Sequence, residues 1–470
     1  MPRLESAHPP RDILGTAFLV MIVLAPLPLG SNRPLWWSLL ALAACVCLVA
    51  FAGLVLARRR QLSFSLNGML AIILPATFAL MWGLFQSCTD VPSVLHNPIW
   101  ATASYALGRP IAGAVSLDPH ESITGVMRLT TYFAVFLLAL QLGRERRFAD
   151  RFLRWFVIAG VAYALYGLAD HILGFDRILW LKRWAYHGFL TSTFVNRNSY
   201  ATFAALGLLC AAALLLNTAR DMFRGSRPRR LQLLALIETL TGPATLPLAA
   251  SLILGIALLQ TGSRAGTFSA FAGLVVMLIA AARAGLLRSR QALVVIALLV
   301  GSGVLFIAIT GTAVVDRLDS ATMESDKSAR AELYALTERA IADQPVLGTG
   351  LGTFPEVFSI YRPQSFDPFV LPSKAHNSYL SNALELGIPA TLLLLLALAL
   401  VGAIAFQGLR RRRRGQMFPV LGLSAMVTVA LHSLVDFSLE IPAVAVAYAA
   451  IAGVCCAQSF RSRNKKKRSA

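Results

Sequence analysis

The sequence predicts an all-α protein that crosses a membrane many times. Apolar residues make up 57% of the 470 residues and charged residues only 14%, and the mean hydropathy is +0.65. Soluble domains contain about 25% charged residues, so this composition excludes a soluble globular fold. Apolar runs of about 17 to 25 residues, the length that a helix needs to span a bilayer, recur along the chain. Because unpaired backbone groups are too costly in lipid, each run should be a helix.

Twelve runs are expected to span the membrane within a single integral membrane domain, 1–470. They lie near 13–30, 35–57, 66–85, 123–142, 152–174, 197–216, 244–261, 266–282, 291–310, 386–406, 418–437 and 441–458. The seventh run is the least regular, because Gly242, Pro243 and Pro247 interrupt its start. Residues 231–240 are an alternative interfacial helix beside it. Losing or splitting this span would invert the orientation of everything after it.

Clustered basic residues indicate the orientation of the chain. With the N-terminus in the cytoplasm, every basic cluster falls on the cytoplasmic side. These clusters lie at 58–60, 144–154, 220–230, 283–290, 410–414 and in the basic tail 461–470. This is the positive-inside pattern, which places both termini in the cytoplasm. The net charge of +20 then reflects the topology and gives an affinity for anionic membrane lipids. It does not indicate a nucleic-acid partner.

Two segments are long enough to work outside the bilayer, and both face the non-cytoplasmic side. They are a first loop, 86–122, and a large loop, 311–385, that carries candidate site residues. Within the large loop, residues 326–343 predict a helix whose apolar side chains share one face. Those side chains are Leu333, Leu336, Ala340 and Ile341. This helix is expected to lie across the membrane surface or to roof a cavity.

A glycine-rich turn, 348–354, follows the loop helix. It superficially resembles a phosphate-binding loop, but no strand precedes it and the lysine of a P-loop is missing. We therefore expect a tight turn that brings backbone N–H groups near a ligand or the membrane.

The few polar residues at span ends are the candidates for chemistry. Arg197 and Arg264 lie at the outer ends of two spans, near the depth of a lipid phosphate. A guanidinium is always charged and grips phosphate bidentately, although snorkelling to lipid headgroups is the alternative. His376 lies near the end of the large loop. An imidazole with an ordinary pKa of about 6.5 can accept a hydroxyl proton; an unremarkable loop histidine is the alternative.

Four motifs, in this order, resemble the superfamily of O-antigen ligases and Wzy-type polymerases. They are FVNRNSYA at 194–201, TGSRAG at 261–266, DQPVLGTGLGTF at 343–354, and HNSYL at 376–380 with ELG at 385–387. The likeness runs from about residue 190 to 445. The N-terminal third contributes only a compatible number of spans.

The resemblance implies a fold similar to type C glycosyltransferases and an inverting, metal-independent transferase of the bacterial inner membrane, with no cofactor. Its site would face the periplasm. It would pass a glycan from an undecaprenyl-pyrophosphate carrier to an acceptor hydroxyl. The acceptor is a lipid A core sugar in the ligase branch and another lipid-linked glycan in the polymerase branch, while proteins are acceptors among other relatives.

The resemblance also implies residue roles. Arg197, Arg264 and His376 would be catalytic, with the two arginines stabilising the pyrophosphate leaving group in the absence of a metal. Substrate-binding residues would be Arg330, Asn196, Asn198, Asn377 and Tyr379. For Arg330, a helix-surface ion pair with Asp326 is an equal alternative.

His432 and Asp436 form a further candidate pair in the eleventh span. Their i, i+4 spacing puts them on one helix face, as a functional pair or as a structural pair between helices. Metal catalysis is disfavoured, because the acidic residues of 316–326 are scattered and no cation-binding spacing occurs on the outer side.

Two other classes of function remain open. A transporter or flippase for lipid-linked glycans would explain twelve spans and an outer arginine clamp, but the two halves of the sequence show no convincing repeat. A sensor or scaffold would have no need for arginines and a histidine at one membrane depth.

Overall fold

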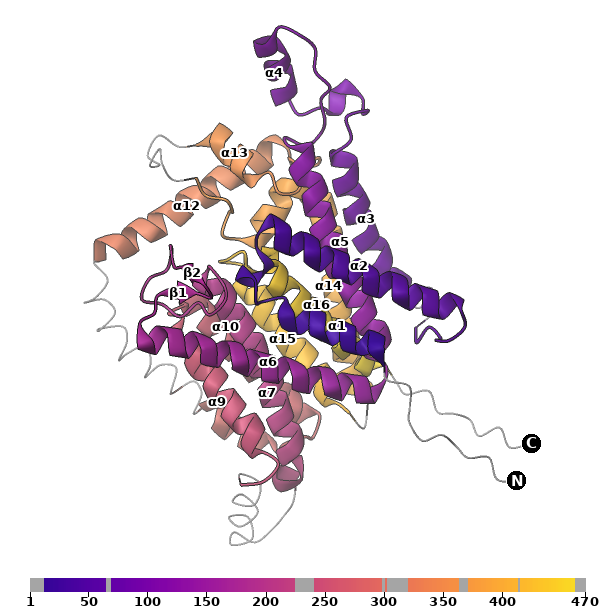
Figure 1. The fold of residues 1–470 in the computed structure, drawn as a ribbon, viewed down its shortest axis with the longest axis vertical. Helices are drawn as coiled ribbons and strands as arrows, with labels where there is room; N and C mark the ends of the chain where they lie inside the picture. Colours follow the sequence, from indigo (N-terminus) through magenta and orange to yellow (C-terminus); the bar gives the residue numbers. More distant parts are fainter. Residues whose placement is uncertain are drawn as a thin grey trace.

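The computed structural model describes residues 12–64, 69–224, 241–297, 301, 320–362, 371–412 and 415–460, and in them the chain is almost wholly helical (Figure 1). The helices are α1 (Ile13–Leu24), α2 (Pro34–Leu56), α3 (Leu70–Gln86), α4 (Ile99–Leu107), α5 (Pro119–Leu142), α6 (Arg146–Leu173), α7 (Arg197–Arg224), α9 (Thr245–Gln260), α10 (Arg264–Arg283), α12 (Ser320–Asp343), α13 (Phe354–Tyr361), α14 (Ser378–Arg411), α15 (Met417–His432) and α16 (Pro442–Ser459). Short 3₁₀ turns are η1 (Leu29–Ser31), η3 (Ser93–Leu95) and η4 (Ser438–Glu440), and β1 (Arg177–Ile178) pairs antiparallel with β2 (Leu181–Lys182).

Seven of these helices are long and apolar enough to cross a membrane, namely α2, α5, α6, the Arg197–Thr218 part of α7, α10, α14 and α16. Four shorter apolar helices, α1, α3, α9 and α15, coincide with other predicted spans. Eleven of the twelve predicted spans therefore have a helix in the structure. The predicted span 291–310 lies mostly outside the described residues, as does the basic tail 461–470.

Helix α16 forms the centre of the bundle. It is buried along its whole length and packs against α5, α14 and α15. Small residues permit this close packing, as they do between other membrane helices. A Cβ atom on Gly453, for example, would lie 2.6 Å from the Phe136 carbonyl oxygen of α5.

One end of the bundle gathers the basic clusters. Asp12, just before α1, accepts ion pairs from Arg60 at 3.4 Å and from Arg151 at 3.2 Å. Arg144 and Arg412 both donate to the Phe460 carbonyl oxygen, at 3.0 and 3.1 Å. The clusters at 58–60, 144–154 and 410–414 thus meet at one face, which is the arrangement that the positive-inside rule predicted.

The large loop is folded onto the bundle. Leu333, Leu336 and Ala340 of α12 are buried against α13 and the start of α14, and Ile341 packs on the same cluster. The predicted apolar face is therefore confirmed, and α12 roofs the beginning of α14 (Figure 1).

The glycine-rich turn packs against a kink in α14. At Gly387 the backbone leaves the helical conformation (φ 76°, ψ 160°). Gly350 N–H donates to the Glu385 carbonyl oxygen at 2.9 Å, and Gly352 N–H donates to the Glu385 carboxylate at 2.8 Å. The prediction of a tight turn is confirmed. The prediction that its N–H groups face a ligand or the membrane is wrong for these two, because Glu385 accepts them.

Two predicted boundaries are also wrong. Helix α14 begins already at Ser378, whereas the predicted span began at 386, so the last part of the predicted loop 311–385 is helical. Helix α15 ends at His432, whereas the predicted span ran to 437. Asp436 therefore lies in the turn after α15.

Candidate functional site

The predicted base, His376, lies beside a buried carboxylate. Its Nδ1 atom is 3.6 Å from Asp436 Oδ1; the His376 side chain is 24% exposed and that of Asp436 only 1%. This distance is too long for a hydrogen bond but brings the two groups into strong electrostatic contact. The His376 ring also packs edge-on against Phe437, with ring centroids 4.8 Å apart. His376 is thus positioned from one side and reachable from the other.

The His376 backbone adopts a left-handed conformation, with φ at +55°. Few residues other than glycine do so without cost. The Tyr334 hydroxyl of α12 donates to the His376 carbonyl oxygen at 3.0 Å, and the Ser378 amide donates to Ser433 at 3.0 Å. The loop helix and the end of α15 therefore hold this strained residue in place.

A short polar chain continues from Asp436 into the bundle. The Ser438 hydroxyl donates to Asp436 Oδ2 at 2.9 Å, and His432 Nε2 lies 4.0 Å from the same oxygen. On its other side, His432 Nδ1 shares a hydrogen bond of 2.5 Å with the Thr202 hydroxyl of α7. The predicted His432 and Asp436 pair is close in space, although the turn after α15 brings the two together rather than a common helix face.

Electrostatics keep Asp436 ionised. Burial alone would raise the pKa of the Asp436 carboxyl, but the neighbouring imidazoles of His376 and His432 outweigh burial, and the pKa is lowered. A permanently negative group beside His376 would stabilise an imidazolium formed there.

Asn377 and Tyr379 have structural contacts that the sequence did not reveal. The Asn377 side-chain oxygen accepts the Tyr379 and Leu380 amides and so caps α14. The Tyr379 hydroxyl donates to the Ala430 carbonyl oxygen of α15 at 3.0 Å. Both residues fix the helix that follows His376.

Arg197 begins α7 and is embedded among aromatic rings. Its guanidinium carbon lies 3.9 Å from the centre of the Phe189 ring and 5.8 Å from that of Tyr186. Asn196 accepts the Asn198 amide at 2.7 Å, so Asn196 acts as the cap of α7. Asn198 is half-buried in the first turn, where its carbonyl oxygen accepts the Thr202 hydroxyl at 3.2 Å.

Arg264 begins α10 directly beside the start of α7. The preceding Ser263 caps α10 by accepting the Gly266 amide at 3.2 Å. A Cβ atom on Gly262 would lie 3.4 Å from Arg197 Nη1, and one on Gly266 would lie 2.7 Å from the Ala201 Cβ. The two arginine motifs, far apart in the sequence, are therefore adjacent, and the two helix N-termini add positive electrostatic potential there.

Arg330 extends the site from the loop helix α12. It lies one helical turn before Tyr334 and is close enough to influence the ionisation of that tyrosine. The Asp326 side chain of the predicted alternative pair lies outside the described residues.

The structure adds four charged residues that the sequence interpretation missed. Arg128, Lys374, Glu385 and Glu440 line the polar end of a cavity of about 340 Å³. Lys374 Nζ is 2.9 Å from Glu440 Oε2. Burial lowers the pKa of the Lys374 ammonium, but Glu440 and Glu385 more than offset this effect, so that its pKa is raised. For Lys374, the signal in the sequence was its position two residues before the HNSYL motif, which begins at His376.

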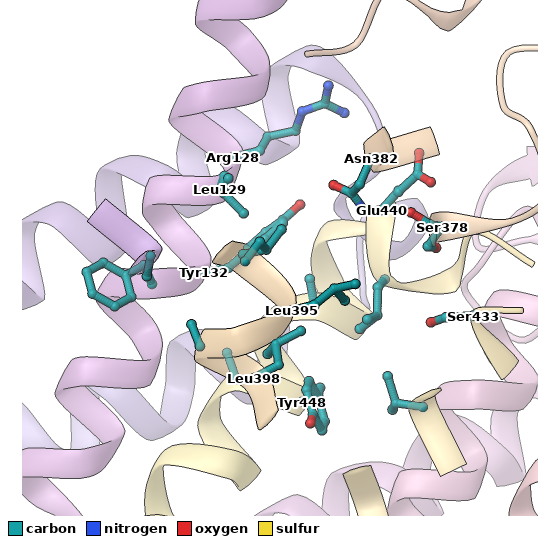
Figure 2. A pocket seen from close by; sticks show the side chains of 18 of the residues that line it. Arg128, Leu129, Tyr132, Ser378, Asn382, Leu395, Leu398, Ser433, Glu440 and Tyr448 are labelled. Carbon is teal, nitrogen blue, oxygen red and sulfur yellow. Dashed lines mark hydrogen bonds between the residues drawn. The ribbon is translucent and has the colours of Figure 1, made fainter. Parts of the chain in front are cut away.

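Figure 2 shows how this cavity is divided. Arg128, Asn382, Ser378 and Glu440 occupy its upper part, whereas Leu395, Leu398 and Tyr448 occupy its lower part. As for metals, no group of three or more His, Cys, Asp or Glu side chains in the described part of the chain is arranged to hold an ion.

The fold and the site define a multi-pass membrane protein with a buried acid and a histidine beneath a helical loop. Residues 249–395 match a family model described as O-antigen ligase. This match covers about a third of the chain and confirms the resemblance to the superfamily of O-antigen ligases and Wzy-type polymerases that the motifs carry. The match contains Arg264, Arg330 and His376 but ends before Asp436. No curated protein matches the chain.

Proposed function

We propose that the protein transfers a glycan from an undecaprenyl-pyrophosphate carrier to an acceptor hydroxyl at the periplasmic face of a bacterial inner membrane, as an O-antigen ligase does. The observation that carries this proposal is the His376–Asp436 contact of 3.6 Å in a chain whose residues 249–395 match the O-antigen ligase family model. A buried carboxylate beside a partly exposed histidine is the arrangement of a general base and the group that orients it.

The proposed reaction needs a base on one side of the sugar and positive charge on the other. The acceptor oxygen attacks the anomeric carbon from the face opposite the pyrophosphate, and its proton passes to His376. The carbon–oxygen bond to the pyrophosphate breaks, and the carrier leaves with the bonding electrons. Asp436 stabilises the resulting imidazolium, and Arg197 and Arg264 stabilise the pyrophosphate. No metal ion enters these steps.

The arginine pair suits the leaving group. Arg197 and Arg264 begin adjacent helices, so two fixed cations and two helix N-termini share one place. Aromatic packing of Arg197 limits its rotamers, which favours a preorganised contact with phosphate oxygens over snorkelling. Arg330, which is near enough to Tyr334 to influence its ionisation, is proposed to contact the donor glycan or phosphate.

The proposed orientation follows from the basic face. The clusters at 58–60, 144–154 and 410–414 meet at one end of the bundle. That end is the cytoplasmic one by the positive-inside rule. Reporter fusions after Arg60 and Arg147 should indicate cytoplasm and a fusion near Phe366 periplasm. A cytoplasmic signal at Phe366 would contradict the proposed site.

A transfer assay tests the proposed function directly. Purified protein in lipid nanodiscs, given undecaprenyl-pyrophosphate-linked glycan and lipid A core, should form the joined product and release the carrier. His376→Ala should abolish product formation. If wild-type protein only moved the donor between leaflets without forming product, the flippase alternative would replace the enzyme.

The main alternative within the superfamily is a Wzy-type polymerase, which uses the same donor but extends another carrier-linked glycan. Deleting the gene should leave lipid A core without polymer while undecaprenyl-linked polymer of normal length accumulates. Single repeat units alone on the carrier would instead show that chain extension was lost. The motifs around Arg264 and His376 are associated most often with ligases. We therefore prefer the ligase branch over the polymerase branch.

A further inference from the structure

The cavity beside His376 is apolar over most of its surface. It lies among α3, α5, α14, α15 and α16, and its volume is about 340 Å³. A closed apolar cavity of about 150 Å³ already holds a six-carbon ring, so this cavity has room for a longer hydrocarbon chain. Leu395, Leu398 and Tyr448 line the end away from the polar residues (Figure 2).

The polar end of the cavity is lined by residues on both sides of the proposed base in the sequence, although His376 itself does not line the cavity. Lys374 and Ser378 both line it, and they bracket His376 in the sequence. A molecule whose chain filled the apolar part would therefore have its head group at the segment 374–378, which carries His376.

Arg128 supplies a cation at this end. Lys374 is already paired with Glu440 at 2.9 Å, whereas within the described residues Arg128 makes no ion pair and rests over the Trp37 ring at 5.0 Å. The Glu385 carboxylate is near enough to interact electrostatically with Arg128, but the two groups form no ion pair, so the guanidinium can still bind a phosphate bidentately. The cavity therefore suits a lipid that has both a hydrocarbon chain and an anionic head group.

Helix α15 separates this cavity from the two arginines assigned to the donor. It packs against α14 and α16 on the cavity side and also against α7 and α10, which carry Arg197 and Arg264 (Figure 1). His432 of α15 bonds to Thr202 of α7, and His376 and Asp436 lie at the end of the same helix. Two lipids could thus approach His376 from different sides.

We propose that this cavity binds one acyl chain of a lipid-anchored acceptor, with Arg128 receiving a phosphate of its head group. The inference rests on the proposed transferase function, because the donor pyrophosphate is assigned to the other side of α15. It narrows the acceptor to a membrane lipid and argues against a soluble protein acceptor.

The test is photolabelling of the full-length protein in nanodiscs with a phosphatidic acid whose acyl chain ends in a diazirine. Labelled peptides should come from α14 and α16 around Leu398 and Tyr448. Lipid A core should compete for labelling, and undecaprenyl phosphate should not. Arg128→Ala should weaken labelling and Arg128→Lys should restore part of it.

Variants of one helix provide the matched comparison. Leu398→Trp fills the cavity and should reduce labelling at least about tenfold, equivalent to about 1.4 kcal/mol. Leu396→Trp is the control, since Leu396 is on the outer surface of α14 with 48% exposure. The probe should label this variant as strongly as it labels the wild type. If Leu398→Trp does not fold, as judged by thermal melting, Leu398→Phe should still show a smaller loss.

Each contrary outcome has a defined meaning. Undiminished labelling of a folded Leu398→Trp protein, or labels outside the cavity, would overturn the proposed binding site. Displacement of the probe by undecaprenyl phosphate alone would overturn the acceptor assignment and place the carrier in the cavity. Because labelling requires no reaction, labelled wild-type protein without transfer activity would refute the proposed function and not the cavity.

Discussion

Asp436→Asn should separate the electrostatic role of Asp436 from its role in packing. The amide preserves the shape of the side chain but removes the negative charge 3.6 Å from His376 Nδ1. At an effective dielectric constant of about 20, two unit charges at that distance interact by about 4.6 kcal/mol. His376 is partly exposed to solvent, so we expect about 2–4 kcal/mol to be lost from transition-state stabilisation, or a kcat reduced about 30- to 1,000-fold.

The assay is transfer by purified protein in nanodiscs, with kcat and KM measured separately for donor and acceptor. The change should appear in kcat, because the imidazolium forms only during reaction. Asp150→Asn is the control, since Asp150 forms an exposed ion pair with Arg146 at the basic end. A kcat within twofold of wild type for a folded Asp436→Asn protein would refute the orienting role.

The same carboxyl predicts a dependence of stability on pH. The folded-state pKa of Asp436 is lowered below the ordinary value of 3.8, so its contribution to stability is fully present above that value. This contribution is lost only as the pH falls through the lowered folded-state pKa. The difference in melting temperature between wild type and Asp436→Asn should shrink as the pH falls below 3.8. A difference that grew as the pH fell below that value would contradict this sign.

Three further predictions concern the arginines, metals and the glycine turn. Arg197→Ala and Arg264→Ala should each reduce kcat about 100- to 1,000-fold, and lysine should rescue poorly because it lacks the planar fork; normal activity of both alanine variants would end the proposed clamp. Activity should survive saturating EDTA, and a loss restored by Mg²⁺ or Mn²⁺ would contradict the metal-free chemistry. Gly350→Ala should destabilise the protein by about 1–3 kcal/mol, because Gly350 has φ +101° and a Cβ there would collide with Ser116; an unchanged melting temperature would argue against this packing.

Composition and periodicity predicted the spans and the loop helix because both depend on local patterns. A long apolar run must be helical in lipid, and the spacing of Leu333, Leu336 and Ala340 defines a face whatever it packs against. The motifs likewise identified Arg197, Arg264 and His376 as candidates, since each lies where an apolar span meets a polar loop.

The cavity and its charged end depend on contacts that no local pattern encodes. Arg128 lies within an apolar helix, and in the sequence it looks like any single arginine in a membrane span. Its role becomes visible only in the fold, where Lys374 and Glu440 line the same cavity. The buried Arg183–Asp170 ion pair, which organises the segment carrying β1 and β2, was missed for the same reason. Helix ends were misplaced where Asn377 extended α14 by capping it and where the chain turned after His432.

The packing of the glycine-rich turn against the kink of α14 has a consequence for how substrates reach the site. Gln86 of α3 donates to the carbonyl oxygens of Leu347 and Glu385 at 2.6 and 2.8 Å. Trp82 donates to the Leu386 carbonyl oxygen at 2.9 Å. Lifting the loop would therefore expose several backbone groups at once. Substrates should instead arrive sideways between helices, so that turnover depends on the density of lipid-linked glycan within the leaflet and on diffusion in two dimensions.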